Sequence, residues 1–259
     1  MSDFSRRRGI SLRAVAPNAV TALALCFGLT GIRFAISAAG VDPRPGDWER
    51  AIGAIVIAGM LDGIDGRIAR LLKGESRFGA ELDSLSDVIA FGVSPAIITY
   101  LWSLQHFPQF GWICALALAV CCALRLARFN AAIDAEEQPH KSAGFLTGVP
   151  APAGAGLVFM PLYLWIVTEN ELFRNPFLVA PWIAFVAALM ISNVATYSWG
   201  SLRLRRHIRL EAILLVALLG AALFSEPWLT LIIISAGYLA MIPFSIRSYA
   251  RVRKARAAA

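Results

Sequence analysis

Eight predominantly apolar stretches follow one another along the chain, each near the length that a helix needs to cross a lipid bilayer. They cover about residues 17–39, 48–72, 79–102, 108–130, 150–168, 177–197, 209–225 and 227–247. Because one crossing takes about 20 residues, eight crossings use about 160 of the 259 residues and leave only short loops. Hydrophobic residues make up 58% of the chain and charged residues 16%, against about half and about a quarter in an average soluble protein. The sequence therefore predicts an all-α integral membrane protein with about eight transmembrane helices, and it excludes an ordinary soluble enzyme.

The basic residues indicate how these helices are oriented. If the N-terminus lies in the cytoplasm, 20 of the 24 Lys and Arg residues fall in cytoplasmic segments and three fall in outer loops. This distribution is the one that the positive-inside rule describes. We therefore expect both termini in the cytoplasm and the protein in the cytoplasmic (inner) membrane. The net charge of +7 then orients the chain and attracts anionic membrane lipids, so no nucleic-acid partner is needed to explain it.

Four aspartates interrupt the second and third stretches, where a membrane helix normally carries no charge. Asp62 and Asp65 are three residues apart and Asp83 and Asp87 are four apart, so each pair shares one face of its helix. At 1.5 Å per residue, both pairs lie about 6–15 Å inside the cytoplasmic end of the hairpin that the two helices form. An antiparallel hairpin can thus bring all four carboxylates to one point.

Such a cluster is expected to bind cations. Four carboxylates at low dielectric repel one another and take up protons unless a cation joins them. The ligand atoms are hard oxygens with no His or Cys nearby, which favours one or two Mg²⁺ or Mn²⁺ ions over zinc. Ions of this kind beside a cleft commonly assist phosphoryl transfer. Gly66 and Ala69 share the face of the aspartates and leave a groove in which a flat ligand can lie.

Two other interpretations of the acidic residues stay open at this point. Buried acids also serve cation transporters and proton relays. Alternatively, the acids form ion pairs with the Arg and Lys residues around the turn between the two helices. That interpretation suits Glu75 and Glu81 better than the four aspartates, because apolar residues flank the aspartates and place them inside the membrane. The residues favour metal-dependent phosphoryl chemistry over both.

The spacing of these residues resembles the signature of a known family. The matching pattern is Asp62-x₂-Asp65-Gly66-x₂-Ala69-Arg70-x₈-Gly79-x₃-Asp83-x₃-Asp87. It is similar at every position to that of the CDP-alcohol phosphatidyltransferases, membrane enzymes that join a CDP-activated group to an alcohol and release CMP. The resemblance implies a six-helix core that is usually dimeric. It also implies that Asp62, Asp65, Asp83 and Asp87 bind two divalent ions, with Asp87 also serving as general base.

A nucleotide site follows from the same resemblance. The opening of the first stretch, Pro17-Asn18-x₂-Thr21, is similar to the family segment whose polar side chains line the nucleotide pocket, although a helix start marked by Pro and Asn explains it equally well. Gly66 and Ala69 are implied to admit the cytidine. The implied CDP-binding residues are Asn18, Thr21, Asp62, Gly66, Ala69, Arg70 and Gly79.

Two further segments narrow the resemblance. Leu-Arg-Leu-Ala-Arg-Phe-Asn at 124–130 and Gly-Phe-Leu-Thr-Gly-Val-Pro-Ala-Pro-Ala at 144–153 look like segments of membrane-embedded (type II) phosphatidylserine synthases. Arg-Arg-Arg-Gly-Ile at 6–10 looks like the opening of their bacterial members. The implied reaction transfers the phosphatidyl group of CDP-diacylglycerol to the hydroxyl of L-serine. The alternatives are a sister enzyme that uses glycerol 3-phosphate, an inositol phosphate or choline, and, outside this class, a cation transporter.

An acceptor that carries a carboxylate suits arginine, whose planar fork donates two hydrogen bonds. Arg125 and Arg128 are three residues apart at the cytoplasmic end of the fourth stretch, with Asn130 beyond them and Lys141 in the following loop. Spacing alone explains the two arginines equally well as membrane anchors. The resemblance favours an acceptor-binding or phosphate-binding role for the two arginines and assigns Asn130 and Lys141 to the acceptor site, although surface charge explains Lys141 equally well.

The predicted organisation has four parts. Residues 1–16 form a basic cytoplasmic segment, 17–200 the six-helix membrane core, 201–247 a transmembrane hairpin and 248–259 a basic cytoplasmic tail. The resemblance is loosest over the hairpin, for which the sequence indicates no role. On the sixth helix, Ser192, Asn193 and Thr196 are expected to form hydrogen bonds between helices, with lining of the substrate pocket as the alternative.

Overall fold

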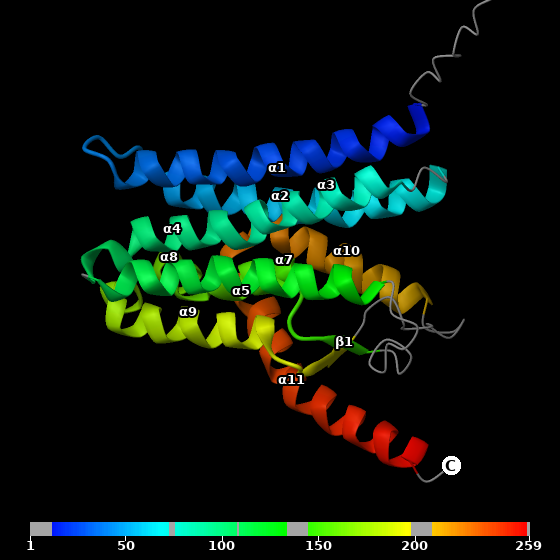
Figure 1. The fold of residues 1–259 in the computed structure, drawn as a ribbon. Coiled ribbons are helices and arrows are strands. Elements are labelled where there is room, and N and C mark those ends of the chain that lie inside the picture. The colour runs from blue at the N-terminus through cyan, green and yellow to red at the C-terminus, as the bar shows by residue number, and fades with distance from the viewer. Residues whose placement is uncertain (1–11, 73–75, 108, 134–144, 198–208, 258–259) are drawn as a thin grey trace, which may run out of the picture.

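Helices occupy each of the eight predicted stretches in the computed structural model, which describes residues 12–72, 76–107, 109–133, 145–197 and 209–257 (Figure 1). Six stretches are single helices. These are α1 (Leu12–Ala39), α2 (Asp47–Leu72), α5 (Phe110–Ile133), α9 (Pro176–Ile191), α10 (Arg209–Ser225) and α11 (Pro227–Ala257). The prediction of an all-α membrane protein is confirmed, apart from one short two-stranded ribbon.

The other two stretches are divided into consecutive segments. The third consists of α3 (Arg77–Asp87), the π-helix η1 (Val88–Val93) and α4 (Ser94–Trp102), and the fifth of α7 (Ala151–Val158) and α8 (Met160–Thr168). Each of α4, α7 and α8 has a proline in its first turn, where a missing N–H removes no helical hydrogen bond. The short 3₁₀ helices η2 (Leu104–His106) and η3 (Glu171–Arg174) precede α5 and α9.

The helices lie alongside one another, and α1 packs along α2 over much of its length (Figure 1). Helix α5 packs against α9 and η1, while α11 contacts α7, α8 and α10. The start of α1 and the end of α11 lie at the same end of the bundle as the end of α2 and the start of α3 (Figure 1). This is the arrangement expected if both termini lie on one side of the membrane.

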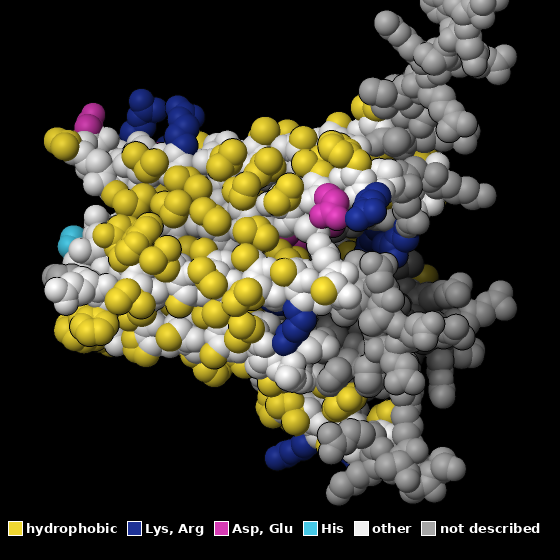
Figure 2. Space-filling model, in the orientation of Figure 1, with side chains coloured by type: hydrophobic (Ala, Val, Ile, Leu, Met, Phe, Trp, Pro, Cys, Tyr) yellow, Lys and Arg dark blue, Asp and Glu magenta, His cyan; other side chains and the backbone are white. Residues whose placement is uncertain are grey.

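The surface is apolar around the middle of the bundle. Figure 2 shows hydrophobic side chains over the centre of the visible face and most charged side chains toward its two ends. Among the described residues, five segments are long and apolar enough to cross a membrane: Val15–Ala39, Arg77–Trp102, Phe110–Ala131, Ala151–Thr168 and Pro227–Val252. The apolar parts of α9 and α10 are shorter, and α2 is more polar because aspartates and arginines interrupt its second half. The protein is a multi-pass membrane protein.

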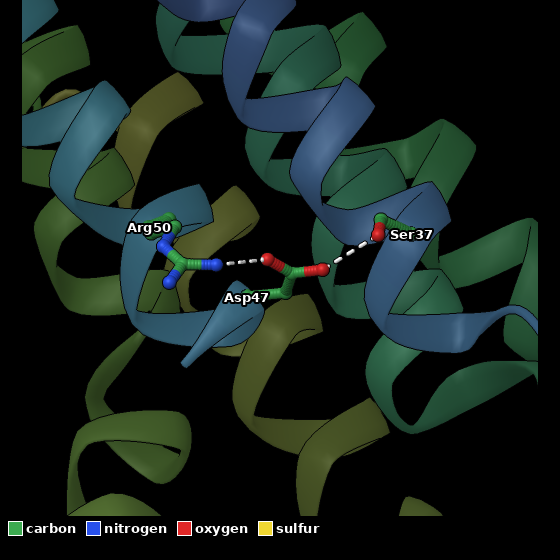
Figure 3. A network of polar contacts seen from close by, with 3 residues as sticks. All are labelled: Ser37, Asp47 and Arg50. Atoms are coloured by element: carbon green, nitrogen blue, oxygen red, sulfur yellow. Dashed lines mark hydrogen bonds and ion pairs between the residues drawn. The ribbon is translucent and has the colours of Figure 1, made fainter. Parts of the chain in front are cut away.

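A buried carboxylate joins α1 to α2 at the end of the bundle opposite the α2–α3 turn. Asp47 is only 2% exposed, and it accepts hydrogen bonds from Ser37 Oγ at 2.6 Å and from Arg50 Nη1 at 2.7 Å (Figure 3). Both carboxylate oxygens are thereby paired, as burial of a charged group requires. These contacts fix the register of α1 along α2, on which the placement of α1 side chains near the aspartates depends.

The sixth stretch differs from the prediction. Helix α9 ends at Ile191 instead of continuing to about residue 197, and the chain then forms β2 (Ala195–Tyr197), which pairs antiparallel with β1 (Phe145–Thr147). At this end the carbonyl oxygens of Ile191 and Ser192 accept hydrogen bonds from Arg128 of α5, and the polar Ser192 and Asn193 follow the last apolar residue of the helix. The expectation that this helix carries Ser192, Asn193 and Thr196 was wrong.

The first and last helices extend beyond the predicted crossings. Helix α1 begins at Leu12, within the segment expected to precede the membrane, and α11 continues to Ala257, through most of the predicted tail. The added turns of α11 are rich in Arg, Lys and Ala, which have high helix propensity, so the helix does not need the membrane to continue.

Candidate active site

Three aspartates from two helices converge within the bundle. One carboxylate oxygen from each of Asp62, Asp83 and Asp87 lies within 4.8 Å of the other two. Asp62 comes from α2, and the other two lie one turn apart on α3, whose start is fixed by Ser76: its side chain accepts a hydrogen bond from Gly79 N at 3.0 Å. All three aspartates are half-buried. The predicted convergence of the α2 and α3 carboxylates is therefore seen for three of the four.

The fourth aspartate lies beside this cluster and is held by α1. Asp65 is 4% exposed, and its Oδ2 accepts a hydrogen bond from Thr21 Oγ1 at 2.7 Å. It is close enough to Asp83 and Asp87 to interact with both electrostatically. The role of Asp65 as a direct metal ligand stays a prediction. The structure adds that Thr21, expected to contact nucleotide, orients this carboxylate.

Helix α1 also holds the second aspartate-bearing helix. Ser86 Oγ donates to the carbonyl oxygen of Thr21 at 3.2 Å. Two turns further along α1, a Cβ at Gly28 would lie 2.9 Å from Ala90 Cα, so this approach of α1 to η1 requires glycine. Since α1 contacts both α2 and α3, it sets the distance between the two pairs of aspartates.

The predicted nucleotide residues lie around the same end of α1 and α2. A Cβ at Gly79 would lie 2.9 Å from Asn18 Oδ1, so α1 and α3 approach closely where both residues were expected to bind nucleotide. A Cβ at Gly66 would meet no described atom within 4 Å, so the helix surface there is open. Arg70 Nε donates to the Gly66 carbonyl at 3.0 Å, and Ala69 is half-buried. The assignment of these residues to CDP stays a prediction.

The π-helix η1 begins directly after Asp87. A π turn holds more residues than an α turn, so the side chains that follow Asp87 are displaced around the axis, and such segments are frequent at functional sites. Within η1, a Cβ at Gly92 would lie 2.9 Å from Cys122 Cβ, which shows how closely α5 approaches. Nothing in the apolar sequence of this segment distinguishes a π-helix from an α-helix.

The two arginines of α5 have different surroundings. Arg128 Nη1 donates to the carbonyl oxygen of Ile191 at 3.0 Å and to Asn193 Oδ1 at 2.9 Å, and its Nη2 donates to Ser192 O at 3.2 Å. These acceptors lie at the end of α9, where carbonyl groups have no partner within the helix. The guanidinium of Arg128 is thus used to terminate α9, which is a structural role.

Arg125 is free of such contacts. Its Nε is buried and has no hydrogen-bond partner among the described residues, and the guanidinium lies within electrostatic reach of Asp87. Asn130 Nδ2 donates to Ser84 Oγ at 2.8 Å, which ties the end of α5 to α3 between Asp83 and Asp87. Lys141 lies outside the described residues. Among the predicted acceptor-binding residues that the structure describes, Arg125 is the one whose surroundings leave it available to a ligand.

The aspartate cluster fits a divalent cation. Mg²⁺ binds oxygen at about 2.0–2.1 Å, so two ligands on opposite sides of one ion are about 4.2 Å apart. Adjacent ligands of an octahedral ion are closer, about 2.9 Å apart, so three carboxylate oxygens within 4.8 Å of one another must draw together by as much as about 2 Å to coordinate one ion. All the donors are hard oxygens, which Mg²⁺ and Mn²⁺ prefer.

Comparison with known proteins agrees with this geometry. A family profile described as CDP-alcohol phosphatidyltransferase matches residues 14–199, which include all four aspartates. The chain belongs to the CDP-alcohol phosphatidyltransferase family. A second profile, described as CDP-alcohol phosphatidyltransferase 2, matches residues 207–243 in the C-terminal hairpin.

Several similar proteins carry one name, CDP-diacylglycerol–serine O-phosphatidyltransferase. The protein of Mycobacterium leprae is 37% identical over 242 residues, which cover 93% of this chain and 77% of that protein. The Helicobacter pylori protein is 34% identical over 182 residues, covering 69% and 70% of the two chains. The Methanocaldococcus jannaschii protein is 41% identical over 141 residues, covering 54% and 60%.

Membership of the CDP-alcohol phosphatidyltransferase family decides between the interpretations that the residues left open. The predicted family and the prediction of a phosphotransferase enzyme are confirmed, and the transporter and ion-pair interpretations are set aside. Members of this family are generally dependent on divalent metals, in agreement with the acidic cluster.

Proposed function

We propose that the protein transfers the phosphatidyl group of CDP-diacylglycerol to L-serine, which yields phosphatidylserine and CMP. The observation that carries this proposal is the similarity of 93% of the chain to a CDP-diacylglycerol–serine O-phosphatidyltransferase. The convergence of Asp62, Asp83 and Asp87, with the available Arg125 beside them, supports it from the structure.

The aspartates would hold the divalent cations that the reaction requires. Asp62, Asp83 and Asp87 supply converging carboxylate oxygens. Asp65, which Thr21 holds by a hydrogen bond, is proposed to be the fourth ligand. Two bound Mg²⁺ or Mn²⁺ ions would supply positive charge to the phosphate oxygens of the substrate and to the leaving CMP. The open helix surface at Gly66 then receives the cytidine, with Asn18, Ala69, Arg70 and Gly79 around it.

Asp87 is proposed as the general base. It lies within electrostatic reach of Arg125, so a serine whose carboxylate binds Arg125 presents its hydroxyl toward Asp87. The serine oxygen forms a bond to the phosphorus that carries diacylglycerol. The bond from this phosphorus to the oxygen bridging the two phosphates breaks, CMP leaves with that electron pair, and Asp87 takes the hydroxyl proton.

An apolar cavity beside the site suits the lipid part of the substrate. It has a volume of about 290 Å³ and lies between α2, η1, α7, α8 and α11. Its lining includes Ile55, Gly59, Phe91, Leu157, Tyr163 and Ile234. We propose that an acyl chain of CDP-diacylglycerol occupies this cavity while the CDP group faces the aspartates.

A homodimer and association with anionic lipids are also proposed, as are the domain limits at residues 17, 200 and 247.

The active site is proposed to face the cytoplasm from the inner membrane, because the positive-inside rule places the segment between α2 and α3 there. Labelling of a cysteine introduced at Arg77, beside this segment, by an impermeant reagent in sealed inner-membrane vesicles of known orientation would test the orientation.

A panel of acceptors tests the reaction itself. Purified protein is given labelled CDP-diacylglycerol and Mg²⁺ or Mn²⁺, together with serine, glycerol 3-phosphate, an inositol phosphate or choline. CMP release and a labelled phospholipid are expected with serine and not with the other three. Comparable turnover with one of those acceptors, and none with serine, would assign the protein to a sister enzyme of the family.

A further inference from the structure

Two neighbouring side chains of α5 and α11 each have a buried polar atom that makes no hydrogen bond with a described residue. Arg125 Nε and the hydroxyl of Tyr238 are each inaccessible to solvent, and neither makes a hydrogen bond with a described residue. Ser94, Trp102 and Ser245 also have a buried side-chain atom without a partner among the described residues, but Arg125 and Tyr238 are within electrostatic reach of each other, and Arg125 is within reach of Asp87. Arg125 and Tyr238 are 113 residues apart in the sequence, and their side chains are brought within electrostatic reach of each other by the packing of the helices.

The position of Arg125 follows from the packing of α5 on η1. Cys122, one turn before Arg125, lies against Gly92 in η1, where an added Cβ would be 2.9 Å away. This contact brings the guanidinium of Arg125 to the start of η1, within electrostatic reach of both Asp87 and Tyr238. Arg125 therefore faces the catalytic carboxylate from one side and the C-terminal hairpin from the other.

Tyr238 reaches the site from α11. Its ring lines the apolar cavity proposed for the acyl chain, while its hydroxyl is buried toward Arg125. The hydroxyl of Thr196 in β2 is close enough to Tyr238 to interact with it, but it donates its own proton to the Gly148 carbonyl at 2.8 Å and makes no hydrogen bond of standard geometry with Tyr238. A tyrosine at such a boundary uses its apolar body on one side and its polar tip on the other.

We propose that Tyr238 and Arg125 together bind the carboxylate of the acceptor, so that the C-terminal hairpin helps to determine which alcohol is used. This inference rests on the proposed function. A carboxylate has two oxygens, and the pair offers a guanidinium N–H and a hydroxyl as two separate donors. Cations held by the aspartates would match the substrate phosphates, which leaves this pair for the acceptor. An acceptor without an anionic group would leave both donors unpaired, and such a site rejects that ligand strongly.

The substitution Tyr238→Phe tests this role, because it removes one oxygen and keeps the ring that lines the cavity. The KM for serine is expected to rise about 10-fold or more, with little change in the KM for CDP-diacylglycerol. The preference for serine over ethanolamine, which lacks the carboxylate, should fall by the same factor. The matched control is Tyr100→Phe, which removes a hydroxyl near the other end of the bundle and keeps the ring contact with Trp112.

A double-mutant cycle with Arg125→Lys shows whether the two residues hold one group. If they do, the loss of kcat/KM for serine in the double variant should be smaller than the product of the single losses. Multiplicative losses would overturn the shared site. So would an unchanged KM for serine in Tyr238→Phe, or a raised KM for CDP-diacylglycerol alone, which would place a substrate phosphate on the pair.

Failure of this inference can be told apart from failure of the proposed function. If the parent protein makes no phosphatidylserine, the proposed function is wrong. If the parent makes it and Tyr238→Phe keeps the parent preference for serine, only the role of Tyr238 is wrong. Melting temperatures of each variant, measured with and without serine, separate lost binding from lost folding: a folded variant should lose the stabilisation by serine.

Discussion

Replacing Thr21 with valine examines how α1 assembles the site. The change keeps the shape of the side chain and removes the hydroxyl that donates to Asp65 Oδ2 at 2.7 Å. That hydroxyl has one proton and two acceptors in reach, and it is closer to Asp65 than to the Pro17 carbonyl oxygen at 3.1 Å. Because Asp65 is only 4% exposed, water has little access to replace the lost donor.

The expected effect is large enough to measure. A hydrogen bond to a charged group contributes about 1.5–3 kcal/mol, which corresponds to about 10- to 150-fold in an equilibrium constant. Loss of a residue that orients a metal ligand typically weakens metal binding by about 10- to 100-fold. We therefore expect Thr21→Val to need about 10- to 100-fold more Mg²⁺ or Mn²⁺ for half-maximal CMP release from CDP-diacylglycerol and serine.

A second threonine of the same helix provides the control. Thr30 Oγ1 donates at 2.6 Å to the carbonyl oxygen of Cys26 within α1, so Thr30→Val should keep the metal dependence of the parent. Parent-like metal dependence in Thr21→Val would refute the reasoning. A raised KM for CDP-diacylglycerol at unchanged metal dependence would instead show that Thr21 binds nucleotide, as the sequence first suggested.

Three further outcomes are expected. Excess EDTA should abolish turnover and lower the melting temperature, and Mg²⁺ or Mn²⁺ should restore both, because the clustered carboxylates repel one another without a cation; full activity after dialysis against EDTA would contradict this. Asp87→Asn should lose kcat while nucleotide binding largely survives, whereas Asp62→Asn should lose both, as kinetics and nucleotide titration can show; near-parent kcat in Asp87→Asn would require another base. Arg128→Ala should lower the melting temperature without a serine-specific rise in KM, since its guanidinium binds the end of α9; a defect confined to the KM for serine would return Arg128 to the acceptor site.

The features that the sequence predicted well are local ones. The number and position of the helices follow from runs of apolar residues, because a helix in a membrane satisfies its own backbone hydrogen bonds and needs only a sufficient apolar length. The separation of Asp83 from Asp87 determines that both share one face of α3, and the short α2–α3 turn brings that face near Asp62. The family could also be predicted, since its signature lies within one such hairpin.

The end of α9 could not be predicted from the apolar pattern. The predicted crossing continues past Ile191 to about residue 197, but Arg128, which is 63 residues earlier in the chain, binds the carbonyl oxygen of Ile191. Once α9 ends there, Thr196 lies on a strand and bonds to Gly148 instead of a neighbouring helix. A contact over such a separation leaves no periodic trace in the sequence.

The partners of individual side chains were likewise decided by the tertiary structure alone. Arg125 and Arg128 are equivalent by spacing. Yet Arg128 binds the end of α9, whereas the buried Nε of Arg125 has no hydrogen-bond partner among the described residues. Thr21 and Asp65 are 44 residues apart and meet because α1 packs along α2. Tyr238 reaches Arg125 only because α11 packs against the core. Sequence spacing determines which face of a helix a residue occupies, but the helix that covers that face, and therefore the partner of the residue, depends on packing between segments far apart in the chain.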